Sequence, residues 1–139
     1  MNEFTVALHG DSEAACVEIL KQYAPLTTGF PAVTIATSLR GYTKDLQWVF
    51  IARKGGNSNP WMAVDKPRID FNIYAATRAD AHDIAQLVLT GMLSAQTNYV
   101  GKGVRLQYVR VETGISRAPD LDNDSDRYVL SLRLTVTPE

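Results

Sequence analysis

The residues most suited to chemistry lie in one short acidic stretch near the end of the chain. The sequence DLDNDSD spans residues 120–126, and it alternates carboxylates as the start of a calcium-binding loop does. Such a loop has glycine at its sixth position and glutamate at its twelfth, but Ser125 and Ser131 occupy those places here. We therefore interpret the stretch as a solvated acidic loop and predict no metal ligands in it.

The histidines and the cysteine form no recognisable site. His9 and His82 fall on different predicted elements, with no cysteine or carboxylate at metal-ligand spacing. Cys16 lies on the apolar face of a predicted helix, where a small core residue is the better interpretation than a nucleophile.

A glycine-lysine pair and a set of arginines are weak indications of phosphate binding. The GKG at residues 101–103 would need a glycine five positions before its Gly-Lys pair and a serine or threonine after it, and Gln96 and Gly103 stand there. Five arginines lie late in the chain, among apolar residues and near the acidic stretch. They are Arg105, Arg110, Arg117, Arg127 and Arg133. Because the net charge is -1, we favour a solvated, ion-paired face over nucleic-acid recognition.

Trp61 and Met62 stand out because they are large apolar residues in a polar stretch. Such residues either fold back over the core or are buried by another chain, and both alternatives remain open. No nucleophile with a base, and no metal set, emerges from the sequence. We expect a non-enzymatic protein without a cofactor.

Composition limits the function classes further. With 139 residues, 45% of them hydrophobic and 21% charged, the chain is expected to form one globular domain over residues 1–139. A single cysteine excludes an internal disulfide. No apolar run approaches the roughly 20 residues that a membrane span needs, and the first residues lack a signal-peptide pattern, so we expect folding in the cytosol and no membrane partner.

The element that organises the chain is the stretch 66–95, where two periodicities meet. Residues 69, 71, 73 and 75 are apolar and alternate with polar ones, which predicts a half-buried strand. Thr77 is then expected to cap a helix, with its hydroxyl accepting the N–H of Asp80. The apolar face of that helix should consist of Ala81, Ile84, Ala85, Val88 and Met92.

The remaining elements follow from similar patterns. We predict a helix capped by Asp11 and ended by Pro25, a short strand at 33–36, and a central strand at 47–53 that is buried on both faces. Residues 54–67 read as a long loop and 98–103 as a turn. Residues 104–112 read as a strand whose alternation slips, which indicates a bulge, a twist or burial of both faces at one end. Residues 114–126 read as a second long loop. The last strand should contain residues 128–137. The fold class is therefore α+β, a mostly antiparallel sheet of four to five strands with two helices packed on one face.

The whole pattern resembles the tail terminator and tail completion proteins of long-tailed bacteriophages, particularly those of phages that infect actinobacteria. The resemblance rests on the strand ending in IARKGG, on DKPRIDFNIYA running into the helix TRADAHDIAQLVLTGML, and on RAPDLDNDSD before RYVLSLRLTV. The individual residues that carry it are Gly55, Gly56, Pro67, Arg68, Asp70, Pro119 and Tyr128.

The resemblance implies a virion protein that assembles in the host cytoplasm into a ring, hexameric in form, on the head-proximal end of the tail tube. Its partners would be other copies of itself, the tail tube protein and the head-tail connector or adaptor. Genomic DNA would pass through the ring without sequence-specific binding. A ring needs two unlike contact surfaces on each subunit. We expect these on the two long loops, at Trp61, Met62, Arg117, Asp120, Asp122 and Asp124.

Two alternatives remain. One is another phage neck protein, such as a head-completion or adaptor protein. The other is a cytosolic small-ligand binding or enzyme domain of ferredoxin-like build, in which Arg68 and Asp70 would line a pocket on the polar face of the sheet.

Overall fold

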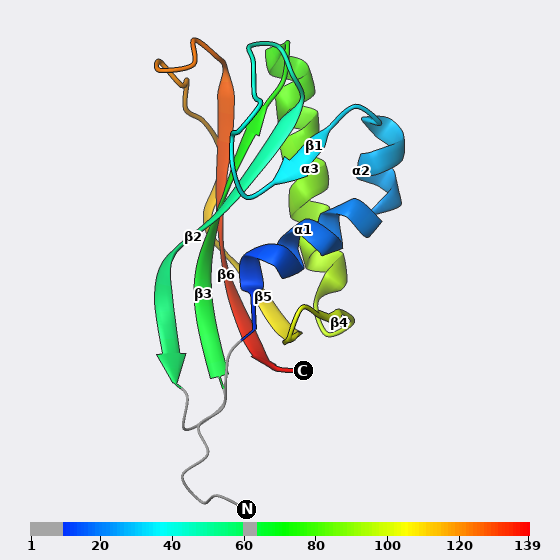
Figure 1. Cartoon of the computed structure of the whole chain (residues 1–139), viewed down its shortest axis with the longest axis vertical. Coiled ribbons are helices and arrows are strands. Elements are labelled where there is room, and N and C mark those ends of the chain that lie inside the picture. Colours follow the sequence, from blue (N-terminus) through cyan, green and yellow to red (C-terminus); the bar gives the residue numbers. More distant parts are fainter. Residues whose placement is uncertain (1–9, 60–63) are drawn as a thin grey trace, which may run out of the picture.

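The computed structural model describes residues 10–59 and 64–139, whose arrangement is shown in Figure 1. The described residues form three helices and six strands. The helices are α1 (Ser12–Gln22), α2 (Ala24–Gly29) and α3 (Arg78–Ala95). The strands are β1 (Thr34–Ala36), β2 (Trp48–Asn59), β3 (Val64–Tyr74), β4 (Val100–Gly101), β5 (Val104–Arg117) and β6 (Arg127–Pro138). Within the described ranges, no helix has the length and apolar character needed to cross a membrane.

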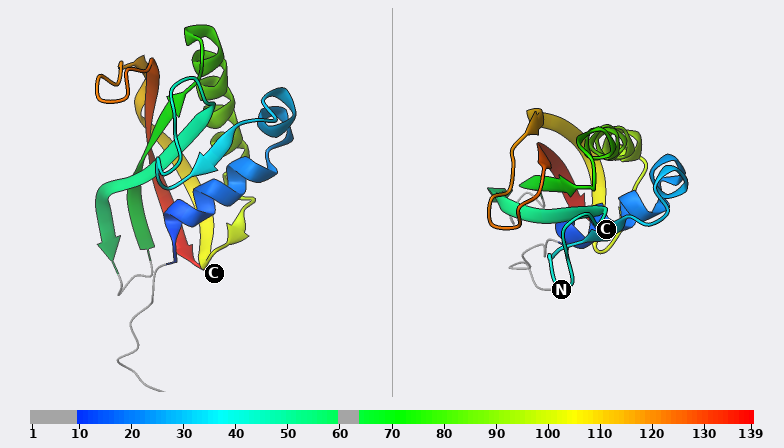
Figure 2. Two further views of the ribbon diagram at one scale, coloured as in Figure 1. Left: turned by 45° about the horizontal axis from the view of Figure 1, so that its top comes forward. Right: turned by 90° about the horizontal axis from the view of Figure 1, so that it is seen from above.

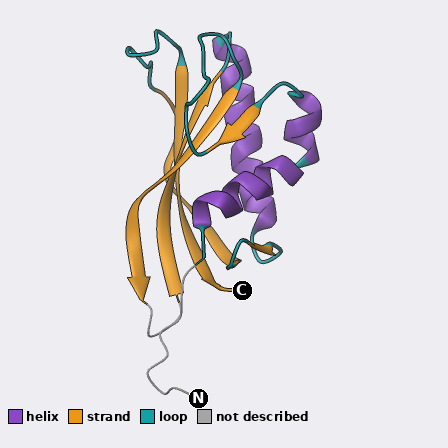
Figure 3. Cartoon of the chain, in the orientation of Figure 1, coloured by secondary structure: helices purple, strands orange, loops and turns teal. Residues whose placement is uncertain are grey.

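All six strands belong to one sheet in the order β1-β2-β3-β6-β5-β4. Neighbours run antiparallel except β1 and β2, which are parallel. The helices lie together against one face of the twisted sheet, which we call the helix face (Figures 2 and 3). The opposite face carries no helix in the described residues, and we call it the open face. The predicted α+β class is confirmed, with six strands in place of four to five and with the short helix α2 in addition to the two expected.

The core lies on the helix face, where the two predicted periodicities meet. Ile69, Phe71 and Ile73 of β3 are fully buried, as their two-residue spacing predicts. The expected apolar face of α3 is also buried, at Ala81, Ile84, Ala85, Val88 and Met92. Burying these side chains against one another is the main source of stability for such a layer.

Both predicted helix caps are present. The Thr77 hydroxyl accepts the backbone N–H of Asp80 at 3.2 Å, at the start of α3. The Asp11 carboxylate accepts the N–H of Ala14 at 3.0 Å, at the start of α1. Each cap satisfies an N–H group that the helix itself leaves without a partner.

β2 and β3 form a much longer hairpin than predicted. We expected a loop over 54–67, but the two strands pair as far as Asn59 and Val64. The register shifts between Arg53 and Gly56. Gly55 and Gly56 have φ values of +92° and +111°, so this glycine pair forms a bulge and does not end the strand.

Three other predictions were wrong in detail. The strand at 47–53 is not the centre of the sheet, because β3 and β6 occupy that place and β2 lies second from the edge. Pro25 lies in the first turn of α2, where its missing N–H costs no hydrogen bond, and α1 already ends at Gln22. The expected turn at 98–103 contains the two-residue strand β4.

The pattern slip in β5 corresponds to shifts in register, which agrees with a bulge, one of the three alternatives that the sequence left open. Pairing of β5 with β6 shifts between Leu106 and Tyr108 and twice more toward Arg117. β5 also continues five residues beyond its predicted end, so the loop expected at 114–126 is reduced to residues 118–126. Bulges add twist, which keeps this long strand wrapped around the core.

Candidate interaction surfaces

The loop 118–126, between β5 and β6, is tightly organised by Asp120. The Asp120 carboxylate accepts the backbone N–H groups of Asp122 and Asn123 at 3.1 and 3.3 Å, and the Asn123 side-chain amide at 2.7 Å. It also accepts the Tyr74 hydroxyl at 2.7 Å. The backbones of Asp120 and Ser125 bond to each other in both directions. This carboxylate therefore holds the shape of the loop, and its part in any interface remains a prediction.

The pKa values at this loop follow from the same bonds. Burial and the hydrogen bond to Asp120 raise the pKa of Tyr74 to about 12, so Tyr74 stays a donor throughout the physiological range. Burial by itself would raise the pKa of Asp120. The hydrogen bonds from Asn123 and Tyr74 outweigh it and lower that pKa below its ordinary value, which keeps the carboxylate ionised.

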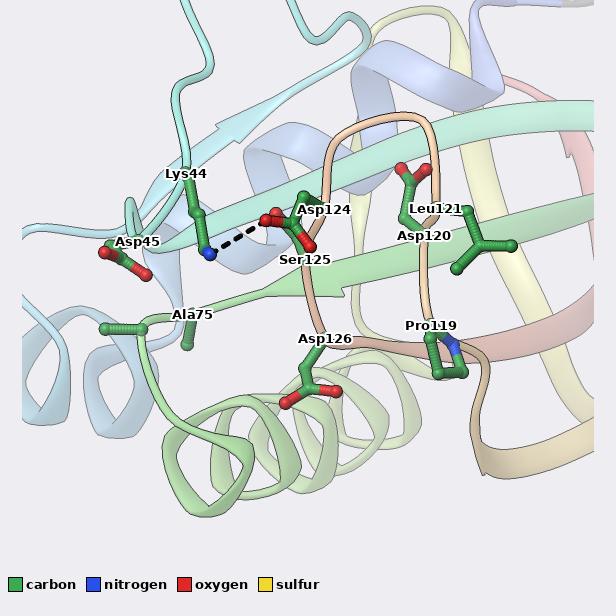
Figure 4. A pocket seen from close by; sticks show the side chains of 10 residues that line it. Lys44, Asp45, Ala75, Pro119, Asp120, Leu121, Asp124, Ser125 and Asp126 are labelled. Atoms are coloured by element: carbon green, nitrogen blue, oxygen red, sulfur yellow. Dashed lines mark hydrogen bonds and ion pairs between the residues drawn. The ribbon is translucent and has the colours of Figure 1, made fainter.

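The tip of the loop faces solvent. Asp122 and Asp124 are exposed, and Leu121 between them is 90% exposed. Lys44, from the connection before β2, contacts Asp124 at 3.0 Å, and Arg117 contacts Asp126 at 2.8 Å. Between the two loops lies a pocket of about 290 Å³, shown in Figure 4. The predicted residues Arg117, Asp120, Asp122 and Asp124 thus belong to one acidic end of the molecule.

An aromatic cluster that we did not predict anchors this end to the open face. Tyr42 lies with its ring centroid 4.8 Å from that of Tyr74 and 5.8 Å from that of Trp48. The Trp48 indole donates to the Ser38 carbonyl at 2.9 Å, and the Tyr42 hydroxyl bonds Ser125 at 2.8 Å. The strand alternation that places Tyr74 on the polar face was a signal for this cluster, but nothing in the sequence identified Tyr42 as its partner.

The other half of the open face carries three arginines in one cross-strand row. Arg68 of β3 pairs with Arg133 of β6, and Arg133 pairs in turn with Arg110 of β5. Like charges directly opposite each other destabilise a sheet, by up to about 1 kcal/mol a pair. We call these three residues the arginine row.

Two carboxylates partly offset the charge of the arginine row. Arg133 and Arg110 both contact the same oxygen of Glu112, at 2.8 and 3.1 Å, and Arg68 contacts Asp70 at 3.3 Å. The hydrogen bond from Arg110, with that from Arg133, lowers the pKa of Glu112 despite its partial burial. Asp70 also accepts the Ser131 hydroxyl at 2.7 Å. Arg68 and Asp70, which the small-ligand alternative placed in a pocket, thus bond to each other.

More cations surround the arginine row. Lys66 and Arg105 are exposed on the same face, one on β3 and the other on β5. Lys66, Arg110 and Arg133 line a pocket of about 300 Å³ together with Tyr108 and Thr135. The sequence contains these arginines but does not show their grouping, which depends on the register of three strands.

One sheet edge is largely unpaired. β4 pairs with β5 only at Val104 and Arg105, and the next outward contacts are Leu106 N–H to the Tyr99 carbonyl and Val109 N–H to the Gln96 side chain. Over residues 110–117 the described chain places no strand on the outer side of β5. An edge of this length can accept a strand from another molecule.

The remaining predicted residues have different outcomes. Trp61, Met62 and His9 lie outside the described residues. Cys16 is fully buried, and burial raises the pKa of its thiol, as expected of a core residue. His82 packs edge-on against Tyr128 at 5.5 Å. Among residues 10–59 and 64–139, no three His, Cys, Asp or Glu side chains are grouped as a metal site requires.

Comparison with known proteins identifies the fold. No protein-family model matches the chain, and no curated protein matches its sequence. A solved structure of the bacteriophage SPP1 gp17 protein is similar, with a TM-score of 0.51 and 20% identity over 88% of this chain and 86% of that one. A chain in the virion of a native gene transfer agent particle is also similar, with a TM-score of 0.56 and 19% identity over 90% of this chain and 93% of that one. At these identities, the likeness establishes that the three chains share a fold.

Proposed function

We propose that this chain is a structural virion protein, a tail terminator that forms a ring at the head-proximal end of a phage tail tube. The observation that carries the proposal is the shared fold. It extends over most of one bacteriophage protein and over most of one chain of a gene transfer agent virion. Apart from the additional short elements α2 and β4, the order of strands and helices that suggested tail terminators in the sequence is also the order in the structure.

The proposed ring would use two unlike surfaces on each subunit, because head-to-tail contacts close into rings. The acidic end, at residues 118–126, is one candidate surface. The unpaired edge of β5 is another, because a strand added there would extend the sheet. In the proposed ring of six copies, one side meets the tail tube protein and the other meets the connector or adaptor, with DNA passing through the centre. The proposal includes no catalytic residue.

The test is assembly with and without tubes. The purified protein would be examined by native mass spectrometry and by negative-stain microscopy, alone and mixed with tail tubes. We expect rings, or density on one end of each tube and a narrow distribution of tube lengths. Tube protein polymerised without this chain is the control. If this chain neither forms rings nor binds tube ends, the proposal is wrong.

The same experiment distinguishes the terminator from the alternative function, that of a head-completion or adaptor protein, which the shared fold also supports. A connector preparation would replace the tubes in a parallel sample. Binding to connectors without any binding to tubes would support the adaptor role in place of the terminator role.

A further inference from the structure

We propose that the arginine row binds the phosphate backbone of duplex DNA without reading its sequence. The choice of ligand rests on the proposed function, in which DNA passes beside this protein. The binding face consists of Arg68, Arg110 and Arg133 with the flanking cations Lys66 and Arg105.

The packing of the fold does not depend on the outer members of this row. Arg68, Arg133 and Arg110 stand directly opposite one another across three strands, and the repulsion between them, which Glu112 and Asp70 partly offset, opposes folding. The side chains of Arg68 and Arg110 are 43% and 61% exposed, so neither fills the core. A cluster of like charges whose outer members face solvent is better explained by binding than by packing.

The row is both preorganised and incompletely neutralised. Glu112 holds Arg110 and Arg133 through one oxygen, and Asp70 holds Arg68. Arg68 also donates to the Ser131 hydroxyl at 3.5 Å, and Arg133 to the Lys66 carbonyl at 3.4 Å. A guanidinium has five N–H donors, so donors remain on all three arginines. Five cations against two carboxylates leave a local charge of about +3, and arginine forks match phosphate oxygens well.

The surroundings of the row favour a nucleic acid over a protein partner. Stable protein interfaces have an apolar core, in which aromatic residues and arginine are enriched and lysine, glutamate and aspartate are depleted. The residues between and around the arginines are instead hydroxyl-bearing: Thr113, Thr135 and Thr137, with Ser131 buried beneath them and bonded to Asp70. Tyr108, 54% exposed, is the aromatic residue that lines the pocket beside the row. Such a surface suits a polyanion.

The geometry of the sheet leaves the arginine row accessible to duplex DNA. The helices pack on the opposite face, so they do not block the row (Figure 2). Strands are about 4.8 Å apart, so the outer arginines stand on backbones about 10 Å apart, and over that distance duplex DNA presents several phosphates. A sheet several strands wide is too broad for a groove of about 12 Å, which leaves the backbone as the contact. The acidic end of the molecule would repel DNA and limit binding to this half of the face.

The experiment measures fluorescence anisotropy of a labelled 30-base-pair duplex titrated with the purified protein. With about three phosphate contacts, we expect affinity to fall about 40-fold between 50 and 200 mM salt. The variant R68Q/R110Q removes two contacts and should bind about 100-fold more weakly at 50 mM salt, since each contact contributes about tenfold there. The variant R68K/R110K keeps the charges and should keep the salt dependence.

The matched control is K44Q/R117Q. It removes the same two charges from exposed, ion-paired side chains at the acidic end. We expect its DNA affinity to stay within a few-fold of the unmodified protein. Equal loss in both double variants would overturn the proposal, because net charge alone would then explain binding. No binding by the unmodified protein at 50 mM salt would also overturn it.

Tube capping distinguishes failure of this inference from failure of the proposed function. R68Q/R110Q should cap tubes normally. Capping without DNA binding would overturn only the role of the arginine row. If R68Q/R110Q loses capping and the unmodified protein does not bind DNA, this face is a contact with another protein. That outcome would also overturn the inference.

Discussion

At the scale of single residues, the contact between Tyr74 and Asp120 joins the sheet to the acidic loop. The hydroxyl donates to the carboxylate at 2.7 Å, while Asp120 also accepts bonds from its own loop. One side chain of β3 is thus connected to a loop that lies 46 positions later in the sequence. This contact explains how a loop rich in like charges keeps a defined shape.

Removing that hydroxyl tests its contribution. The variant Y74F should lower the free energy of unfolding by about 1–2 kcal/mol, because the carboxylate loses one hydrogen bond while its other bonds remain. Urea denaturation followed by circular dichroism measures the change. Y108F is the matched control, since Tyr108 is 54% exposed, and it should change stability little. Equal effects in the two variants would contradict this account.

The lowered pKa of Asp120 predicts a dependence on pH. In the folded state its carboxyl binds protons less readily than in the unfolded state, so between the two pKa values the unfolded chain binds more protons. The stabilisation is complete above the ordinary carboxyl pKa of about 4 and is lost as pH falls through the lowered value. Unfolding free energies measured from pH 6 to pH 2 should therefore fall more steeply in the unmodified protein than in D120N. Parallel curves would show that Asp120 makes no such contribution.

At the scale of elements, the β2–β3 hairpin depends on one glycine. Gly56 has a φ of +111°, and a Cβ atom there would collide with the carbonyl oxygen of Lys66 on the partner strand. Pro67, which has no N–H to donate, pairs opposite Gly56. The bulge therefore lets a hairpin contain a glycine pair and a proline that would otherwise end its strands.

The variant G56A should disturb this hairpin. We expect a loss of about 2–3 kcal/mol in unfolding free energy, from the unfavourable φ together with the collision, and faster cleavage of the hairpin by protease. G114A is the control, because a Cβ at Gly114 would meet no atom within 4 Å and that residue has no positive φ. A G56A protein as stable as G114A would mean that the bulge is not rigid.

At the scale of the whole molecule, charge is strongly separated although the net charge is only -1. One end carries Asp120, Asp122, Asp124 and Asp126, and the other half of the open face carries the arginine row. The near-neutral net charge is therefore the sum of an acidic end and a basic face. These two surfaces are available for different partners.

Charge reversal at the acidic end tests its proposed role in assembly. The variant D122K/D124K should associate with tail tubes about tenfold more weakly, because reversed charges at an interface oppose the approach of the partner. Its circular dichroism should be unchanged and its melting temperature should change little, since both residues are exposed and the ion pair of Asp124 with Lys44 lies at the surface. D83K, on the exposed side of α3, is the control. Normal capping by D122K/D124K, or infectious particles at normal yield, would remove this loop from the interface.

The sequence by itself determined the fold class, the two longer helices with their caps, and the faces of β3 and β6. Those features depend on neighbours within a few residues. The period of burial and the choice of Asp11 and Thr77 as caps are local, so they can be read directly along the chain. The same locality explains the irregularity in β5, where the alternation visibly slips.

Only the tertiary structure decided which distant residues meet. Glycines and prolines at 54–67 resembled a loop because they disfavour strands locally, but pairing with β3 and one bulge overrode that preference. Tyr42, Tyr74 and Asp120 converge from two loops and a strand, and the arginine row requires the register of β3, β6 and β5. Register is a property of paired strands, and a shift of one residue would place these side chains on the opposite face. The sequence of one strand does not determine which strand pairs with it, so only the folded molecule shows the acidic end and the basic face.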